Sequence, residues 1–201
     1  MSAHILNVYV PVLPRTTLTH CYGILRPVMG RPNIILTGFM GTGKSSSGRV
    51  LARKLGYDFI DSDTMIEMQQ GISVAEIFEQ QGEAAFRQLE SRAASELAQR
   101  EGQVIATGGK LMLDANNAAV LGRTGRVFCL TATPEELAKR LSSKTARRRR
   151  PLLKDVDLNR YIDSLLAERG PAYQQFQQID TTGKQPAQVA GAIIKILRGH
   201  K

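Results

Sequence analysis

The residues with the clearest chemical potential form a glycine-rich loop. Residues 38–45 read GFMGTGKS and fit the pattern G-x-x-x-x-G-K-[ST]. In such a loop the backbone amides point into one concavity that suits phosphate, and the following helix start adds partial positive charge. Lys44 can reach the β- and γ-phosphates of a nucleoside triphosphate, and Ser45 can ligate Mg²⁺. The apolar run 33–37 and the helical spacing of apolar residues in 46–55 supply the strand–loop–helix context that makes this pattern specific.

Two carboxylates, Asp61 and Asp63, follow the apolar run 57–61. Alternation along a strand would put both on the same side at its carboxyl end, where open α/β sheets bind ligands. One carboxylate suits the water shell of Mg²⁺, and the other can accept a proton from an attacking hydroxyl during phosphoryl transfer. The alternative is a solvated turn that caps a helix. The neighbouring phosphate loop favours the functional interpretation.

An arginine and a glycine pair are further candidates. Arg87 lies in the expected helix 82–100 and is either a surface charge or a bidentate clamp for a carboxylate. Periodicity does not decide between these alternatives. Gly108 and Gly109 follow the buried-type strand 103–107, where glycines can bring backbone amides close to a ligand or simply form a turn.

A basic segment at 142–157 contains four consecutive arginines, residues 147–150, and interrupts a helical pattern. It is either a solvated charge run or a mobile lid that brings an arginine onto the transferring phosphate and excludes water. The helical pattern resumes at 157–173 and carries Arg169.

The elements that must position these residues alternate along the chain. The sequence predicts strands at 33–37, 57–61, 103–107, 126–131 and 179–181, and helices at 46–55, 64–81 with a break at Gly71 and a cap at Ser73, 82–100, 111–121, after Thr133, at 157–173 and at 187–197. This alternation predicts a parallel sheet covered on both faces. Without an internal repeat or a linker, we expect one such domain.

Composition limits the function further. The chain has 201 residues, 42% of them hydrophobic, and no apolar run near the length of about 18 residues that a membrane helix needs. The net charge of +9 suits an anionic ligand, whereas the absence of Trp and only 5% aromatic residues argue against nucleic acid as the main partner. Cys21 and Cys129 are too few for a disulfide framework, so a reduced core thiol at Cys129 and a cytoplasmic location are expected.

Residues 1–28 differ from the rest of the chain because they contain no Asp or Glu and are interrupted by prolines. We expect a poorly ordered, dispensable N-terminal extension at 1–28 and a compact domain at 29–201.

Taken together, the motifs resemble the shikimate kinase family, in the nucleoside monophosphate kinase-like branch of P-loop proteins, over about residues 33–197. The resemblance rests on their order: the loop 38–45, FIDSD at 59–63, GE with FR at 82–87, GG at 108–109, RPLL at 150–153, ER with Tyr at 168–173, and Pro186.

The resemblance implies an α/β, three-layer P-loop kinase fold with a five-stranded parallel sheet, helices on both faces and a mobile lid. It implies ATP-dependent phosphorylation of the 3-hydroxyl of shikimate, on the route to chorismate and the aromatic amino acids. The expected partners are ATP and shikimate, with Mg²⁺ as cofactor, in a monomer that needs neither nucleic acid nor a membrane.

Residue roles carry over motif by motif. The resemblance implies an ATP site made by Gly41, Thr42, Gly43, Lys44, Ser45, Ser46, Arg150 and Pro186. Ser45 and Asp61 would hold Mg²⁺, Asp61 through water. Asp63 would orient and deprotonate the attacking hydroxyl, with Lys44 and Arg150 on the phosphates. The shikimate site would comprise Asp63, Arg87, Gly108, Gly109 and Arg169, with Phe78 and Phe86 lining the ring pocket.

Two departures from the family pattern stand out. Lys110 replaces the third glycine that the family usually has after Gly108 and Gly109, and Ser143 stands where an adenine-stacking arginine is common. Lys110 either points to solvent, contacts a substrate, or marks a related small-molecule kinase of altered specificity, such as a gluconate kinase-like or nucleotide kinase-like protein. A non-catalytic ATP-binding relative is a further alternative, against which the intact set of candidate residues argues.

Overall fold

The computed structural model describes residues 30–142 and 157–199. The expectations for residues 1–28 and for the lid at 142–157, including Arg150 and Ser143, lie outside the described residues except at Ser142 and Asp157. None of the described helices is both long and apolar enough to cross a membrane.

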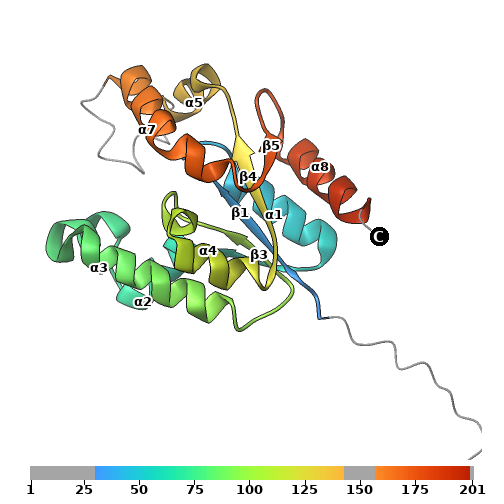
Figure 1. The fold of residues 1–201 in the computed structure, drawn as a ribbon, viewed down its shortest axis with the longest axis horizontal. Coiled ribbons are helices and arrows are strands. Elements are labelled where there is room, and N and C mark those ends of the chain that lie inside the picture. The colour runs from blue at the N-terminus through green and yellow to red at the C-terminus, as the bar shows by residue number, and fades with distance from the viewer. Residues whose placement is uncertain (1–29, 143–156, 200–201) are drawn as a thin grey trace, which may run out of the picture.

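Five parallel strands form a single sheet in the order β2-β3-β1-β4-β5, as the resemblance implies (Figure 1). The strands are β1 (Asn33–Gly38), β2 (Asp58–Asp61), β3 (Gln103–Ala106), β4 (Gly125–Thr131) and β5 (Gln177–Asp180). The helices are α1 (Lys44–Leu55), α2 (Ser62–Gln70), α3 (Val74–Leu97), the 3-10 turn η1 (Leu111–Leu113), α4 (Ala115–Gly122), α5 (Pro134–Leu141), α7 (Leu158–Tyr173) and α8 (Pro186–Arg198).

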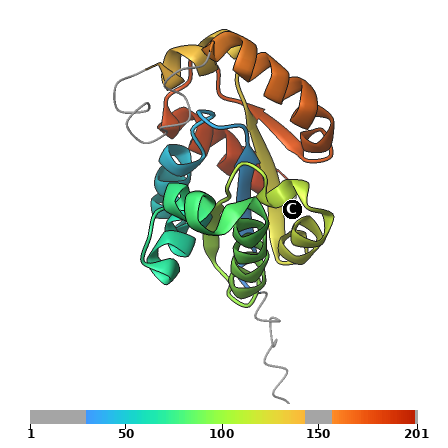
Figure 2. The ribbon, with the colours of Figure 1, turned by 90° about the vertical axis from the view of Figure 1, so that its left-hand side faces the viewer.

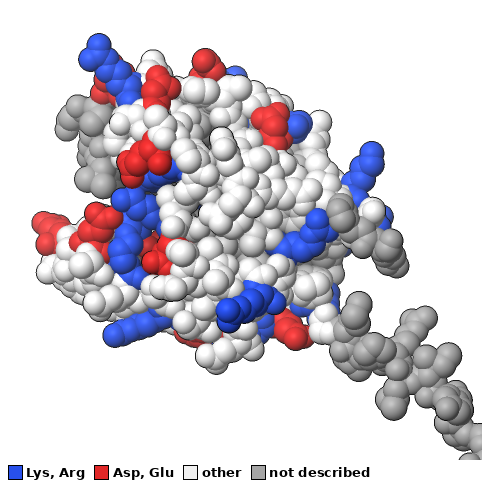
Figure 3. Space-filling model, in the orientation of Figure 1, with Lys and Arg blue, Asp and Glu red and all other residues white. Residues whose placement is uncertain are grey.

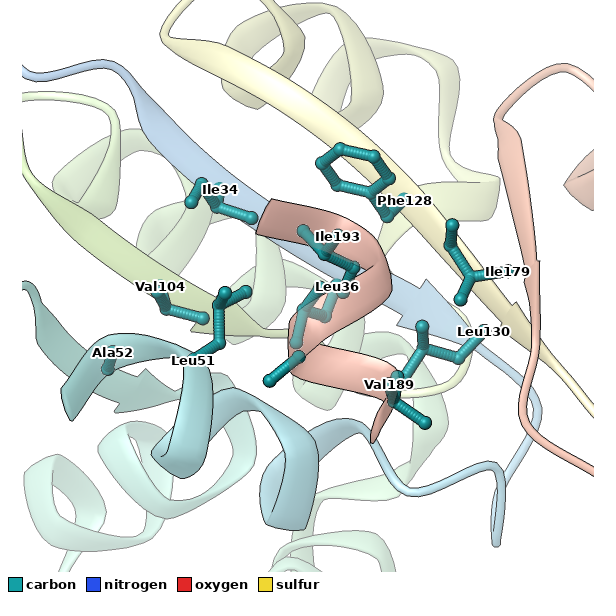
Figure 4. Close-up of a cluster of buried hydrophobic side chains, with 11 residues drawn as sticks. Ile34, Leu36, Leu51, Ala52, Val104, Phe128, Leu130, Ile179, Val189 and Ile193 are labelled. Carbon is teal, nitrogen blue, oxygen red and sulfur yellow. The ribbon is translucent and has the colours of Figure 1, made fainter. Parts of the chain in front are cut away.

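Both faces of the sheet are covered, which the central strand shows residue by residue. Ile34 and Leu36 of β1 pack in one core cluster with residues of α1 and α8 (Figure 4). Ile35, between them, points the other way and packs with residues of α3, η1 and α4. Burying each such side chain contributes about 1.5–3 kcal/mol, so the apolar run of β1 stabilises both layers. Cys129 is buried in the described core, as expected, and burial raises the pKa of its thiol to about 11.

The carboxyl ends of all five strands lie at one edge of the sheet because every pairing is parallel. From β1 the chain continues to β2 and β3 on one side and later to β4 and β5 on the other, so the order changes direction beside the glycine loop. Ligands of open α/β sheets bind at such a point. Helices α3 and α7 lie on opposite sides of this loop (Figures 1 and 2).

The strand alternation expected for Asp61 and Asp63 is wrong. Strand β2 ends at Asp61, which is the N-cap of α2, and its carboxylate accepts hydrogen bonds from the amides of Asp63 and Thr64. Asp63 therefore lies in the first turn of a helix. The capping alternative is correct for Asp61, because a side-chain oxygen there satisfies amides that have no partner within the helix.

The helix expected at 111–121 is divided. A 3-10 turn covers Leu111–Leu113, and Asp114 then caps α4 by accepting a hydrogen bond from the Asn117 amide at 2.9 Å. An aspartate at this position offers the backbone a capping bond instead of a continued helix.

Helix α3 contains a break at Gly82, where φ is 81° and ψ is 172°. The expected boundary at Gly82 is thus a kink inside one long element. Upstream, Gly71 ends α2 in the left-handed conformation and Ser73 opens α3 with a capping box to Glu76, as predicted.

Gly38 at the end of β1 is a residue whose replacement should harm the fold directly. Its φ is +126°, and an added Cβ would lie 2.2 Å from the Leu130 carbonyl oxygen of β4. We expect Gly38→Ala to lower the free energy of unfolding by at least about 2 kcal/mol in urea denaturation, since neighbouring backbone cannot yield cheaply. Gly191→Ala is the matched control. Its Cβ meets open space in α8, and it should stabilise by about 0.5–1 kcal/mol. Equal stability of Gly38→Ala and the wild type would contradict this account.

Candidate active site

The glycine loop has the conformation that a phosphate cradle requires. Gly41 and Gly43 have φ of 82° and 91°, in the left-handed region that favours glycine, and Gly43 caps the start of α1. The Lys44 ammonium donates to the carbonyls of Gly38 at 2.7 Å and Phe39 at 3.0 Å. The lysine thus lies back along the loop, within the concavity expected for it.

One cavity, of about 400 Å³, opens on the outer side of this loop. It collects the predicted ATP-site residues that the structure describes there, together with the turn before α8: Gly41, Thr42, Gly43, Ser46, Thr181, Gly183, Lys184, Gln185 and Pro186. Its volume suits a small organic ligand.

Arg140 of α5 braces this first cavity and was missed by the sequence analysis. Its guanidinium donates to the carbonyls of Gly41 at 3.1 Å and Thr181 at 2.7 Å, and to the Glu136 carboxylate at 2.8 Å. These bonds tie the glycine loop to the end of β5. An arginine four residues after a glutamate in a helix ordinarily indicates only a surface pair, so the sequence carried no usable signal.

A second cavity, of about 390 Å³, opens on the other side of the loop. Ten of its lining residues were candidates from sequence: Lys44, Ser45, Asp61, Asp63, Phe78, Phe86, Arg87, Gly108, Gly109 and Arg169. Lys110 joins them, as do two acids: Glu83, which is part of the motif at 82–87, and Glu90, which the sequence did not indicate. Figure 3 shows basic and acidic side chains close together in the hollow between the α3 and α7 regions.

Ser45 and Asp61 meet where α1 begins and β2 ends. The Ser45 hydroxyl donates to Asp61 Oδ2 at 2.6 Å. The described residues contain no cluster of three or more His, Cys, Asp or Glu that could hold a metal on its own. A hydroxyl and one carboxylate nevertheless fit Mg²⁺, which uses few protein ligands and completes its shell with water and substrate phosphates.

The Asp63 carboxyl is buried, and its pKa is raised. Burial raises the pKa of its carboxyl to about 6, with further increases from Asp61 and Glu90, and Lys44 acts in the opposite direction. Oδ1 of Asp63 is buried and has no hydrogen-bond partner in the described chain. A carboxylate in this state is suited to accept a proton from a ligand near neutral pH.

Gly108 and Gly109 play different parts. The Gly108 amide donates to the Ser62 hydroxyl at 2.8 Å, and an added Cβ at Gly108 would lie 2.4 Å from Oδ1 of Asp63. Gly108 therefore makes room for the carboxylate, while its amide is already bonded to the protein. The Gly109 amide has no protein acceptor among the described residues, so of the two it is the amide that can meet a ligand.

Helix α7 holds the Gly109 turn from the opposite side. The Tyr173 hydroxyl donates to the Gly109 carbonyl at 2.5 Å, and burial raises the pKa of Tyr173 to about 12, so it remains a donor. Arg169, one turn earlier, places Nη1 against Gly109, and its buried Nε has no hydrogen-bond partner in the described chain. Tyr173 was part of a motif in the sequence, but its contact with Gly109 was not foreseen.

Arg87 lines the second cavity, which favours the clamp alternative over a plain surface charge. It bonds to Glu83 through Nε at 3.2 Å and Nη2 at 2.7 Å, and to the buried Glu90 through Nη1 at 2.5 Å. The guanidinium also lies over the rings of Phe78 and Phe86, which pack 4.8 Å apart between ring centroids. Burial raises the pKa of the Glu90 carboxyl in spite of Arg87.

Lys110 lines the second cavity and is partly exposed. Its φ is −110°, so the position makes no demand for glycine. The ammonium lies 3.2 Å from Oε1 of Glu83, within the lining of the second cavity. The side chain is 35% exposed as well as paired with Glu83, so all three alternatives for Lys110 stay open.

Known proteins are similar to this chain over most of its length. A family model described as shikimate kinase matches residues 40–198. The chain is 44% identical to a shikimate kinase of Geobacter metallireducens over 169 residues, 84% of this chain and 93% of the relative. Among solved structures it is similar to shikimate kinase from Acinetobacter baumannii in complex with shikimate, with a TM-score of 0.79 and 35% identity over 85% of this chain and 95% of that one. The corresponding values for shikimate kinase from Aquifex aeolicus are 0.71 and 33% over 83% and 96%.

Because the Asp63 carboxyl is buried, its ionised form should lower the free energy of unfolding. Its pKa of about 6 in the folded protein exceeds the ordinary value of 3.8, so the folded state binds this proton more tightly than the unfolded state does. Well below pH 3.8 the carboxyl is neutral in both states, and the penalty grows as pH rises from 3.8 to about 6 and stays constant above that. Asp63→Asn should therefore raise the free energy of unfolding at pH 7.5 by about 2 kcal/mol.

Thermal unfolding of Asp63→Asn and wild type from pH 4 to pH 8 measures this difference, which should shrink toward the acid end. Asp58→Asn, on the exposed first residue of β2, is the control and should track the wild type throughout. An Asp63→Asn protein no more stable than wild type at pH 7.5 would rule out the cost.

Proposed function

The chain belongs to the shikimate kinase family, and from this we propose that its two cavities hold the two substrates of one phosphoryl transfer. The enzyme phosphorylates the 3-hydroxyl of shikimate at the expense of ATP, on the route to chorismate. One observation carries the assignment of the cavities: the glycine loop lies between them. Gly41, Gly43 and Ser46 line the first, whereas Lys44 and Ser45 line the second.

The first cavity would bind ATP. Backbone amides of residues 41–46 and the start of α1 would surround the phosphates. The opposite wall, which includes Lys184 and Pro186, would take the adenosine part. Arg140 would keep the two walls in place. Arg150, which lies outside the described residues, remains our candidate for closing onto the phosphates, and the 142–157 segment our candidate for a lid.

The second cavity would bind shikimate. Shikimate carries one carboxylate and three hydroxyls, and this cavity offers cations for the former and acceptors for the latter. Asp63 Oδ1, Glu90 Oε1 and Arg169 Nε are buried polar atoms without hydrogen-bond partners in the described chain. Such atoms normally have partners, so their grouping at one cavity supports a polar ligand there. Arg87, Arg169 and the Gly109 amide would bind the carboxylate.

Transfer then requires positioning and charge neutralisation more than covalent chemistry by the protein. Asp63 would accept a hydrogen bond from the 3-hydroxyl and take its proton as the oxygen bonds to the γ-phosphorus of ATP, while the bond from that phosphorus to the bridging oxygen breaks and ADP leaves with the electron pair. Lys44 would stabilise negative charge on the phosphoryl oxygens. Ser45 and Asp61 would hold Mg²⁺, Asp61 through water, and the ion would supply charge neutralisation for the ATP phosphates.

Several broader expectations continue as proposals. We propose that the kinase domain is formed by residues 29–201 with 1–28 as a dispensable extension, and that it acts as a monomer in the cytoplasm without nucleic acid or membrane. These points are separate from the activity itself.

ADP release from ATP in the presence of candidate acceptors tests the function. We expect turnover with shikimate and none above background with gluconate, quinate or nucleoside monophosphates. Faster turnover of another acceptor would favour a sister kinase with specificity altered at Lys110. ATP binding without turnover of any acceptor would favour a non-catalytic relative. Loss of shikimate turnover in Arg87→Lys and Arg169→Lys variants would locate the reaction in the second cavity.

The role of Asp63 predicts a pH profile. A base works only when ionised, so log kcat/KM for shikimate should fall with unit slope as pH drops below about 6, the pKa of Asp63. Asp63→Asn should lose about 10²-fold or more in kcat while keeping its affinity for ATP. Shikimate 3-phosphate quantified directly by chromatography avoids the pH dependence of coupling enzymes. A flat profile down to pH 5, or an active Asp63→Asn enzyme, would remove Asp63 from this role.

A further inference from the structure

The carboxylate-binding edge of Arg87 is already occupied in this structure. Glu83 Oε1 accepts from both Nε and Nη2 of Arg87, at 3.2 and 2.7 Å. This edge of a guanidinium presents two parallel N–H groups, which is the geometry that binds a carboxylate most strongly. A substrate carboxylate that used this edge would meet Glu83 there first.

The two glutamates on Arg87 differ in how easily they can leave. The Glu90 side chain is 2% exposed and would remain a buried, unpaired acid if its bond to Arg87 were broken. The Glu83 side chain is 55% exposed and can be solvated at once. An entering carboxylate would therefore displace Glu83, and Glu90 would continue to orient the guanidinium from Nη1.

Lys110 provides the second partner that Glu83 needs. Its ammonium lies 3.2 Å from the same Oε1 atom that Arg87 binds, and its side chain is 35% exposed. Glu83 belongs to α3, directly after the kink at Gly82, whereas Lys110 directly precedes η1. The two cations thus reach one carboxylate oxygen from different elements, across the lining of the second cavity.

We propose that Glu83 is an internal stand-in for the substrate carboxylate, and that Lys110 takes it over when the substrate binds Arg87. The pair then sets the affinity for carboxylate-bearing acceptors, with Glu83 as a competitor and Lys110 as its release partner. Neither side chain takes part in the transfer step. This inference rests on the proposed function, because it requires Arg87 to bind the acceptor carboxylate.

The inference makes a directional prediction for Glu83→Gln. Removing the competing charge should lower KM for shikimate about three- to fivefold, the scale of an exposed ion pair, with kcat and KM for ATP unchanged. If Glu83 instead merely holds Arg87 in place, the same variant raises KM. Glu96→Gln is the matched control, because Glu96 is also on α3 and forms an exposed pair with Arg100 beyond the end of that helix; it should leave KM unchanged.

The role of Lys110 is tested by asking whether its effect on KM for shikimate depends on Glu83. Lys110→Met should raise KM for shikimate about threefold, because Glu83 then depends on Arg87 alone. In the Glu83→Gln background the same substitution should have no effect. A Lys110→Met effect of equal size in both backgrounds would overturn the release role and show direct attraction of substrate instead.

An uncharged substrate tests whether the effect of Glu83 depends on the substrate carboxylate. Shikimate carboxamide lacks the charge that competes with Glu83, so Glu83→Gln should not improve its KM. Improvement for the amide as large as for shikimate, or an unchanged or raised KM for shikimate, would overturn the inference while the proposed function stands. Failure of the wild type to phosphorylate shikimate in the same assay would overturn both.

Discussion

The parallel pairing of β1 with β3 on one side and β4 on the other is the constraint on which the rest of this molecule depends. Together with the parallel pairing of β2 with β3, it requires the loops after β1, β2 and β3 to leave the sheet at one edge. Ser45, Asp61 and Gly108 are far apart in the sequence, yet all three line the second cavity at this edge. Gly38, where the glycine loop begins, pairs with Leu130 of β4. A side chain at Gly38 would collide with the Leu130 carbonyl, so this pairing requires a glycine there.

The second cavity also requires a balance of charge, and its lining residues supply both signs. The described lining holds the bases Lys44, Arg87, Lys110 and Arg169 and the acids Asp61, Asp63, Glu83 and Glu90. Desolvation still prevails at the most buried acids, where it raises the pKa of Asp63 and of Glu90. The site therefore keeps acids at a cost in stability, which is common where a protein must perform proton transfer.

Sequence reasoning reached the sheet, the glycine loop and most of the cavity residues because those signals are local. The apolar runs, the capping serine at Ser73 and the glycine at Gly71 each act within a few residues. It failed where the deciding contact joins distant segments. Asp61 could be read as a strand end or a cap, and only its bonds to Ser45 and to the α2 amides show that it serves both. The partners of Lys110 and Tyr173 lie 27 and 64 residues away in the chain, and no spacing rule finds them.

The kink at Gly82 separates the part of α3 that forms one wall of the second cavity from the rest of the helix. The segment from Val74 to the kink is a rigid helical rod about 12 Å long, at 1.5 Å per residue. It carries Val74 and Phe78, which form one wall of the cavity. A rotation of about 10° at Gly82 would move the Val74 end of this segment by about 2 Å. Ile77 of the same segment is buried against Ile66 of α2 and against Phe86, so this wall of the cavity belongs to a core cluster separate from the two that cover the sheet.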